Sequence, residues 1–146
     1  MSVNNISLRL ITYGCGDAFD RARFVPVQNR QHVKPFGGLW ASPVDCAYGW
    51  REWCTAEDYG NLESSFQTLY KGHTLIIDSL ADLTDMIWQR TYYCGWPDYE
   101  AMLHEGIAGI YLTERGQIET RFSIPGLYGY DCECVLVLNP DCVVAS

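Results

Sequence analysis

Apolar and polar residues alternate in several short runs along this chain, and such alternation predicts β-strands that bury one face. The first run, Leu8–Tyr13 (LRLITY), is rich in residues that favour strands and is followed by a glycine. Five further segments are expected to be strands: Phe36–Ser42, His73–Asp78, Ile107–Thr113, Ile118–Phe122 and Cys132–Asn139. The pattern therefore predicts a β-sheet at the centre of the fold.

The segment Pro43–Cys54 has the features of an amphipathic helix. Ser42 precedes it as an N-cap, proline suits the first helical position, and Asp45 lies in the first turn, where its carboxylate can accept unpaired N–H groups. Apolar side chains then recur at spacings of three and four residues: Cys46, Ala47, Trp50, Trp53 and Cys54. We predict a helix over this segment, capped by Ser42.

Two more helices are expected further along the chain. Ser79 followed by Asp82 matches a capping box at the start of a helix. Three apolar residues of that helix are expected to face inward: Leu80, Leu83 and Ile87. Pro97–Glu105 predicts a short third helix that ends at Gly106.

The remaining segments have no regular period. Gly14–Lys34 is expected to be a long loop, of the length that is usually functional or disordered, and Thr55–Lys71 to be irregular or weakly helical. The sequence has no repeat, low-complexity tract or linker, and 146 residues is a usual size for one domain. We expect residues 1–146 to form a single α+β domain with a central antiparallel or mixed β-sheet and short flanking helices.

The net charge of −8, from 10 basic and 18 acidic residues, makes contact with nucleic acid or anionic lipid unfavourable. The nearest approach to a basic cluster is Arg21, Arg23, Arg30 and Lys34, which is either a solvated loop or a site for one small anionic ligand. No apolar run approaches the length of a membrane span, and the first residues do not resemble a secretory signal. We therefore expect a cytoplasmic protein.

The seven cysteines favour neither a disulfide framework nor a metal site. Their number is odd, no CxxC occurs, and His32, His73 and His104 do not lie at ligand spacings. We expect free, mostly buried thiols and no bound metal. A hydrolase that pairs Cys15 with His32 stays open as an alternative, without a supporting motif.

Glu133 is the most informative single residue, because it is a carboxylate within the apolar run CECVLVLN. Alternation places Glu133, Val135 and Val137 on one face of the predicted strand. The carboxylate then lies either at the mouth of a pocket, as is typical of catalytic acids, or on an edge strand as a solvated charge.

Aromatic residues form 14% of the chain, and four of them fall close together: Trp40, Tyr48, Trp50 and Trp53. Their faces can hold a planar ring such as nicotinamide or adenine, although a Trp-rich helix is also typical of a core. The sequence contains no GxGxxG, Walker, HExxH or GxSxG motif, which removes the basis for the corresponding enzyme classes.

Four segments, in this order, resemble the motifs of the ADP-ribosyltransferase fold family. LRLITYG resembles its opening strand, and KPFGGLWASPVDCAYGWREW resembles its second motif, a strand followed by a helix beneath the nicotinamide pocket. DYEAMLHEGIAGIYLT resembles a helix-then-strand piece, and YGYDCECVLVLNPDCVV the last motif, where a catalytic glutamate opens a strand. The resemblance covers roughly half of the chain and implies a split β-sheet.

The resemblance also implies roles for particular residues. Glu133 matches the catalytic glutamate and Asp131 the position two before it, Ser42 matches the hydroxyl of the second motif, and Arg9 is the basic residue of the first strand. The sequence departs from the family at three positions, with Tyr13 where His or Arg is frequent, Ala41 where Thr is common, and Asp131 in place of Gln or Glu.

The chemistry implied is cleavage of NAD with transfer of ADP-ribose to a macromolecular acceptor, expected to be a protein. Glu133 would stabilise the positive charge that develops on the ribose. Trp40 or Tyr48 would hold the nicotinamide ring, and Arg9 with a loop arginine would hold the pyrophosphate. The alternative is a non-catalytic phage or bacterial accessory module on the same fold, which binds a partner through its aromatic and acidic surface.

Overall fold

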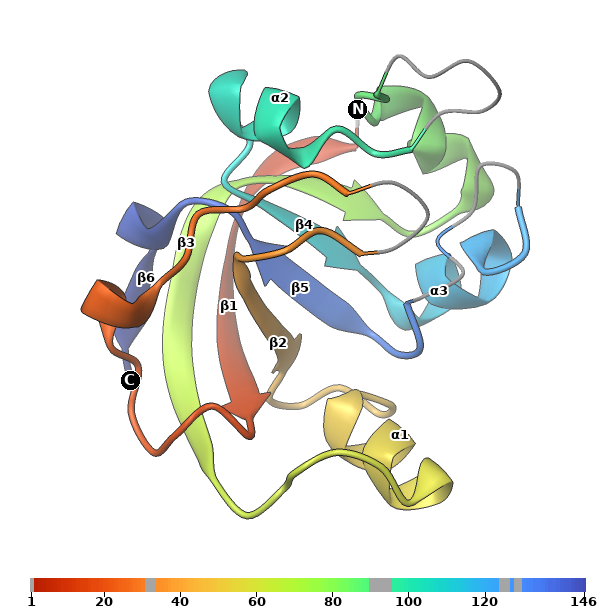
Figure 1. Cartoon of the computed structure of the whole chain (residues 1–146). Helices are drawn as coiled ribbons and strands as arrows, with labels where there is room; N and C mark the ends of the chain where they lie inside the picture. Colours follow the sequence, from red (N-terminus) through yellow and green to blue (C-terminus); the bar gives the residue numbers. More distant parts are fainter. Residues whose placement is uncertain (1, 31–33, 90–95, 124–126, 128–129) are drawn as a thin grey trace.

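Five strands of the computed structural model close into a β-barrel, because β1 pairs on one side with β2 and on the other with β3. The structure describes the chain except residues 1, 31–33, 90–95, 124–126 and 128–129. Around the barrel the strands follow the order β1 (Val3–Tyr13), β2 (Leu39–Pro43), β5 (Cys134–Val137), β4 (Gly109–Leu112) and β3 (Ser65–Ile77). A short strand at the C-terminus, β6 (Val143–Ala145), also pairs with β3 (Figure 1).

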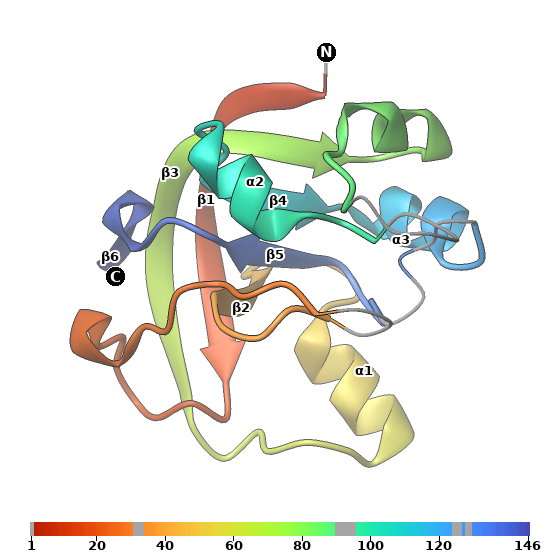
Figure 2. The same ribbon diagram turned by 45° about the horizontal axis from the view of Figure 1, so that its top comes forward.

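The helices are short and lie outside the strands (Figure 2). They are α1 (Trp50–Glu57), α2 (Tyr99–His104) and α3 (Glu114–Thr120), with short 3-10 segments at Arg21–Arg23, Leu80–Asp85 and Pro140–Cys142. The chain is thus a single small domain that mixes helices and strands, as the sequence predicts. No helix within the described ranges is long and apolar enough to cross a membrane.

β1 forms a long ladder with β3 and a very short ladder with β2. β1 and β3 pair antiparallel along their length, from Val3 opposite Leu75 to Tyr13 opposite Ser65. β1 and β2 pair only at Leu10 with Pro43 and at Ile11 with Ser42. β3 and β4 run parallel, so the sheet is mixed. Because the β1–β2 ladder stops so early, the barrel wall opens between the end of β1 and the start of β2.

Two apolar layers follow from the alternation of side chains along the strands. The interior of the barrel is filled by one layer, in which the largest buried members are Leu10, Leu39, Phe66, Tyr70, Val135 and Val137. The outer face of β3, β4 and β5 carries the second layer, which α2 and the turn at Leu80–Asp85 cover with Leu83, Tyr99 and Met102.

Two of the predictions that depend on local hydrogen bonds are confirmed, the capping box at Ser79 and the short helix before Gly106. Ser79 and Asp82 form the predicted capping box, although the turn that follows is 3-10 and its Leu80 is 49% exposed instead of facing inward. α2 lies within the predicted Pro97–Glu105, with Asp98 accepting the N–H of Ala101 as its cap. Gly106 follows the helix at a positive φ of 93°, which glycine adopts without strain.

The predicted helix over Pro43–Cys54 is wrong in its first half. Pro43 is the last residue of β2, and α1 begins only at Trp50. The reason is that Ser42 and Pro43 pair with β1, so the capping signals of Ser42 and Pro43 occur at the end of a strand.

Two further expectations are corrected. Ile118–Phe122 is not a strand, because α3 begins after Thr113, whose hydroxyl accepts the N–H of Gly116, and Ile118 is 67% exposed on that helix. The segment expected to be irregular becomes β3 from Ser65 onward. In the first part of β3 the buried alternate residues, Phe66, Thr68 and Tyr70, point into the barrel, and the residues between them face outward.

Candidate functional site

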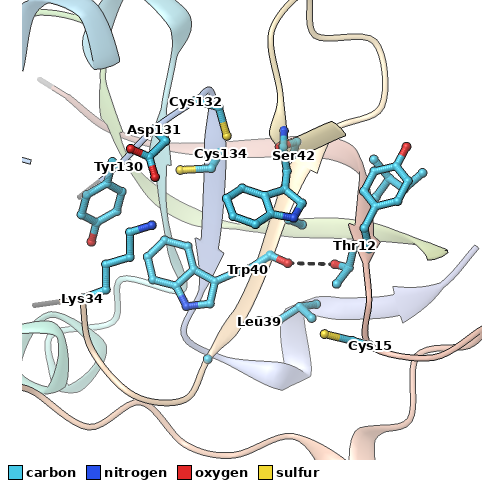
Figure 3. Close-up of a pocket in the computed structure, with 15 residues that line it drawn as sticks. Thr12, Cys15, Lys34, Leu39, Trp40, Ser42, Tyr130, Asp131, Cys132 and Cys134 are labelled. Atoms are coloured by element: carbon cyan, nitrogen blue, oxygen red, sulfur yellow. Dashed lines mark hydrogen bonds between the residues drawn. The ribbon is translucent and has the colours of Figure 1, made fainter. Parts of the chain in front are cut away.

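A cleft of about 340 Å³ lies on the outer side of the barrel at the opening between β1 and β2. The wall comes from the end of β1, from β2, from the segment that leads into β5, and from Trp50 of α1. Its lining is Ile11, Thr12, Tyr13, Cys15, Lys34, Gly38, Leu39, Trp40, Ala41, Ser42, Trp50, Tyr130, Asp131, Cys132 and Cys134 (Figure 3). The Thr12 hydroxyl donates to the Trp40 carbonyl at 2.9 Å, which bridges the strands where their ladder has ended.

Aromatic rings and one lysine form a side wall of the cleft. The rings of Trp40 and Tyr130 lie 5.4 Å apart between centroids, at an angle of 53°. The Lys34 ammonium lies 5.3 Å from the Trp40 ring and 5.5 Å from the Tyr130 ring (Figure 3). A cation over two ring faces is attracted by both. The wall therefore offers apolar faces for a flat ligand next to a positive charge.

Ser42 is a buried junction beneath this wall. Its hydroxyl accepts the N–H of Trp50 at 3.0 Å and donates to the carbonyl oxygen of Glu133 at 2.9 Å. It thereby caps the start of α1 from a different part of the chain. The Glu133 N–H in turn donates to the Tyr48 carbonyl at 3.1 Å. β2, α1 and the start of β5 are joined at this one side chain.

Asp131 supplies a carboxylate to the cleft. Its side chain is 21% exposed, and its Oδ1 lies 3.5 Å from a terminal nitrogen of Arg121. This ion pair links the segment before β5 to the residue that follows α3. The cleft thus contains a carboxylate and an ammonium group among apolar surfaces.

Two of the thiols that line the cleft, those of Cys132 and Cys134, are not activated. Burial raises the pKa of Cys132 to about 11, and burial also raises the pKa of Cys134. Both thiols are therefore protonated at neutral pH, and a protonated thiol is a poor nucleophile and metal ligand. Cys15 also lines the cleft, but its proposed partner His32 lies outside the described residues.

Glu133 does not line the cleft, although its neighbours Cys132 and Cys134 do. Alternation turns its side chain to the same face as Val135 and Val137, which fill the barrel, as the sequence predicts. There the carboxylate accepts a hydrogen bond from the Tyr111 hydroxyl of β4. Burial, and then the hydrogen bond to Glu133, raise the pKa of Tyr111, which therefore stays protonated as the donor.

The structure brings together some of the predicted site residues and separates others. Tyr13, Trp40, Ser42 and Asp131 line the cleft. Arg9 and Tyr48 are not among the residues that line it, and Arg9 is exposed on β1. Lys34 and Tyr130 are among the lining residues that had no role in the sequence-based site. Lys34 belonged to the scattered basic cluster, whereas Tyr130 had no signal beyond its place in the last motif.

A second hollow of about 600 Å³ adjoins the cleft. The two hollows share Cys15, Gly38, Leu39 and Trp40 in their linings. The second hollow is lined by phenylalanine rings and by two arginines: Phe19, Phe24, Phe36, Phe66, Arg23 and Arg30. The cleft thus contains the carboxylate of Asp131 among aromatic rings, and the second hollow contains two guanidinium groups among aromatic rings.

The described part of the chain contains no group of three or more His, Cys, Asp or Glu side chains arranged to hold a metal ion. Six cysteines lie in that part and are free. Comparisons with models of protein families, with curated proteins and with solved structures found no match for this chain.

Proposed function

We propose that the cleft between β1 and β2 binds NAD, and that the chain is an ADP-ribosyltransferase-like enzyme that transfers ADP-ribose to a macromolecular acceptor. The observation that supports this most is that Tyr13, Trp40, Ser42 and Asp131 line one cleft. The family resemblance matched Ser42 and Asp131 to two separate motifs, Trp40 was expected to hold the nicotinamide ring, and Tyr13 stands where the family frequently has His or Arg.

The chemistry of the cleft suits this reaction. Cleavage of the bond between nicotinamide and ribose builds positive charge on the ribose, and a carboxylate in a partly dry site stabilises such charge. The faces of Trp40 and Trp50 offer apolar surface to the nicotinamide ring. Two carboxylates are candidates for the charge-stabilising role: Glu133 from the resemblance, and Asp131 from its position in the cleft.

The test compares NAD hydrolysis by the wild type, Glu133→Gln and Asp131→Asn, each of which keeps the size of the side chain and removes its charge. A fall of about two orders of magnitude or more in Glu133→Gln supports the assignment from the resemblance. The same fall in Asp131→Asn alone assigns the role to Asp131. If the wild type does not hydrolyse NAD, the proposal that the chain is an enzyme is contradicted.

One observation favours a second candidate, a non-catalytic binding module on the same fold. The Glu133 carboxylate is bound by Tyr111 on the barrel side of its strand and does not line the cleft. A module of this kind would bind a ligand or partner without cleaving it. A rise in melting temperature with NAD, by mass action, combined with no release of nicotinamide would support a module that binds NAD.

A further inference from the structure

The aromatic side chains of α1 and of the turn that follows it form a cluster outside both apolar layers. Trp50 and Trp53 stack with their ring centroids 5.0 Å apart and their planes at 19°. The Tyr59 ring lies close to perpendicular to both, 6.1 Å from Trp50 and 5.2 Å from Trp53. None of the three rings belongs to the described residues of either layer, and Cys54 is the one buried residue of α1, all of which the structure describes. These tryptophans therefore do not serve the core.

The turn after α1 holds this cluster in place and leaves it accessible. Asp58 ends the helix at a positive φ of 50°, and the Tyr59 N–H donates to the Cys54 carbonyl at 3.0 Å, so the chain turns back towards the tryptophans. Tyr59 is 60% exposed, and both tryptophans are partly exposed. α1 lies at the end of the molecule opposite α2, which covers the outer apolar layer (Figures 1 and 2). Exposed aromatic residues that are already ordered are typical of a surface that binds a partner.

Negative charge is concentrated around these rings. Residues 44–63 contain five acidic residues and one basic residue, so half of the net charge of −8 lies in this segment. Glu52 lies in α1 between the two tryptophans, Glu57 is four residues after Trp53 and so lies on the same face of the helix, and Asp58 follows it. None of these three carboxylates forms a salt bridge with, or accepts a hydrogen bond from, a residue that the structure describes. Their charge is therefore available to a partner.

We propose that the α1 surface, made of Trp50, Trp53 and Tyr59 with the carboxylates around them, binds an arginine-rich segment of a partner protein. A guanidinium group is attracted by an aromatic ring and pairs with carboxylates, so one arginine side chain uses both features of the surface. The same charge repels nucleic acid and acidic protein segments. An arginine-rich partner is therefore the occupant that the rings and the carboxylates favour together.

The α1 surface adjoins the candidate cleft, because Trp50 belongs to both. A segment bound there lies beside any ligand in the cleft. If the chain transfers ADP-ribose, the α1 surface is where a basic protein acceptor docks, and that statement alone rests on the proposed function. The binding of the segment itself needs neither NAD nor its cleavage, so it applies equally to a non-catalytic module.

The test titrates the full chain, without NAD, into a fluorescent peptide in which arginine alternates with serine, and measures anisotropy. The same peptide with citrulline, which is neutral and similar in shape, should bind about tenfold more weakly or less. The double variant Glu57→Gln, Asp58→Asn should weaken binding of the arginine peptide about threefold or more. Its matched control is Glu105→Gln, Glu114→Gln, which removes the same charge from exposed positions of other elements and should bind as the wild type does.

A second pair of variants tests the aromatic part of the surface. Tyr59→Phe keeps the ring and should bind the arginine peptide as the wild type does. Tyr59→Leu keeps an apolar side chain without the ring and should bind about threefold more weakly. Melting temperatures establish that the variants fold. Tyr59 and Glu57 are exposed, and asparagine tolerates the left-handed backbone of Asp58.

The proposal is overturned if the citrulline peptide binds as tightly as the arginine peptide, or if the control double variant loses as much affinity as the variant at α1. Equal binding by Tyr59→Leu and Tyr59→Phe overturns the role of the ring. The outcome is separable from that of the proposed function, because the peptide is titrated without NAD. Selective peptide binding without NAD hydrolysis by the wild type keeps the α1 surface and rejects the enzyme. NAD hydrolysis without selective peptide binding does the reverse.

Discussion

The Ser42 hydroxyl donates a hydrogen bond to the carbonyl oxygen of Glu133 at 2.9 Å, and so joins the end of β2 to the residue before β5. The same oxygen accepts the N–H of Trp50, which places the start of α1 at this junction. Because one buried hydroxyl both donates to the residue before β5 and accepts from the first residue of α1, it positions α1 and the two strands together. The wall of the cleft therefore depends on a residue whose hydroxyl is engaged with main-chain groups.

Ser42→Ala should lower the free energy of unfolding by about 1–3 kcal/mol, because it leaves the N–H of Trp50 and the carbonyl of Glu133 without this partner in a buried place. Urea denaturation measures the change. Ser7→Ala, at an exposed position of β1, is the control and should change stability very little. Equal losses of unfolding free energy in the two variants would contradict a stabilising role for the Ser42 hydrogen bonds.

Tyr111 and Glu133 should be energetically coupled. Tyr111→Phe removes the hydroxyl that donates to the Glu133 carboxylate and should lower stability at neutral pH by about 1–3 kcal/mol. Once that hydroxyl is gone, Glu133→Gln should have a smaller effect than it has in the wild type. A double-mutant cycle by urea denaturation measures the coupling. Additive losses would show that the hydrogen bond does not contribute to stability.

Thr68→Val should raise stability by about 1 kcal/mol. The Thr68 hydroxyl is buried in the barrel without a hydrogen-bond partner among the described residues, and valine has the same shape without the polar atom. Thr74→Val is the matched contrast, because that hydroxyl bonds Tyr70 at 2.6 Å and Gly72 at 2.9 Å, and its loss should destabilise the barrel. The prediction fails if both variants change stability in the same direction.

Thiol labelling should separate Cys15 from Cys132 and should depend on pH. The thiolate is the reactive form, and burial raises the pKa of Cys132 to about 11, so its labelling should be slow at pH 7 and should quicken as the pH rises towards that value. Cys15 is exposed and should be modified first. Mass spectrometry of peptides after timed labelling measures both rates. Equal rates at neutral pH would contradict a buried, protonated Cys132.

Features that depend on neighbouring residues could be read from the sequence. The capping box of Ser79 and Asp82 and the helix within Pro97–Glu105 rest on hydrogen bonds between residues three or four positions apart, so no distant partner is needed to form them. The alternation from Glu133 to Val137 also predicted correctly which side chains share a face. Ser42 and Asp131 were chosen by their motifs and Trp40 as one of the clustered aromatic residues, and all three line one cleft.

Features that depend on contacts between residues far apart in the chain could not be read from the sequence. Pro43 ends a strand because Leu10 pairs with it, and Glu133 meets Tyr111 because β4 and β5 are neighbours in the barrel. The alternation around Glu133 could not tell whether its face looks into the barrel or into the cleft. That choice is made when β1 pairs with β3 and closes the barrel. Spacing along the chain specifies which side chains lie together on a strand, but strand pairing sets what they face.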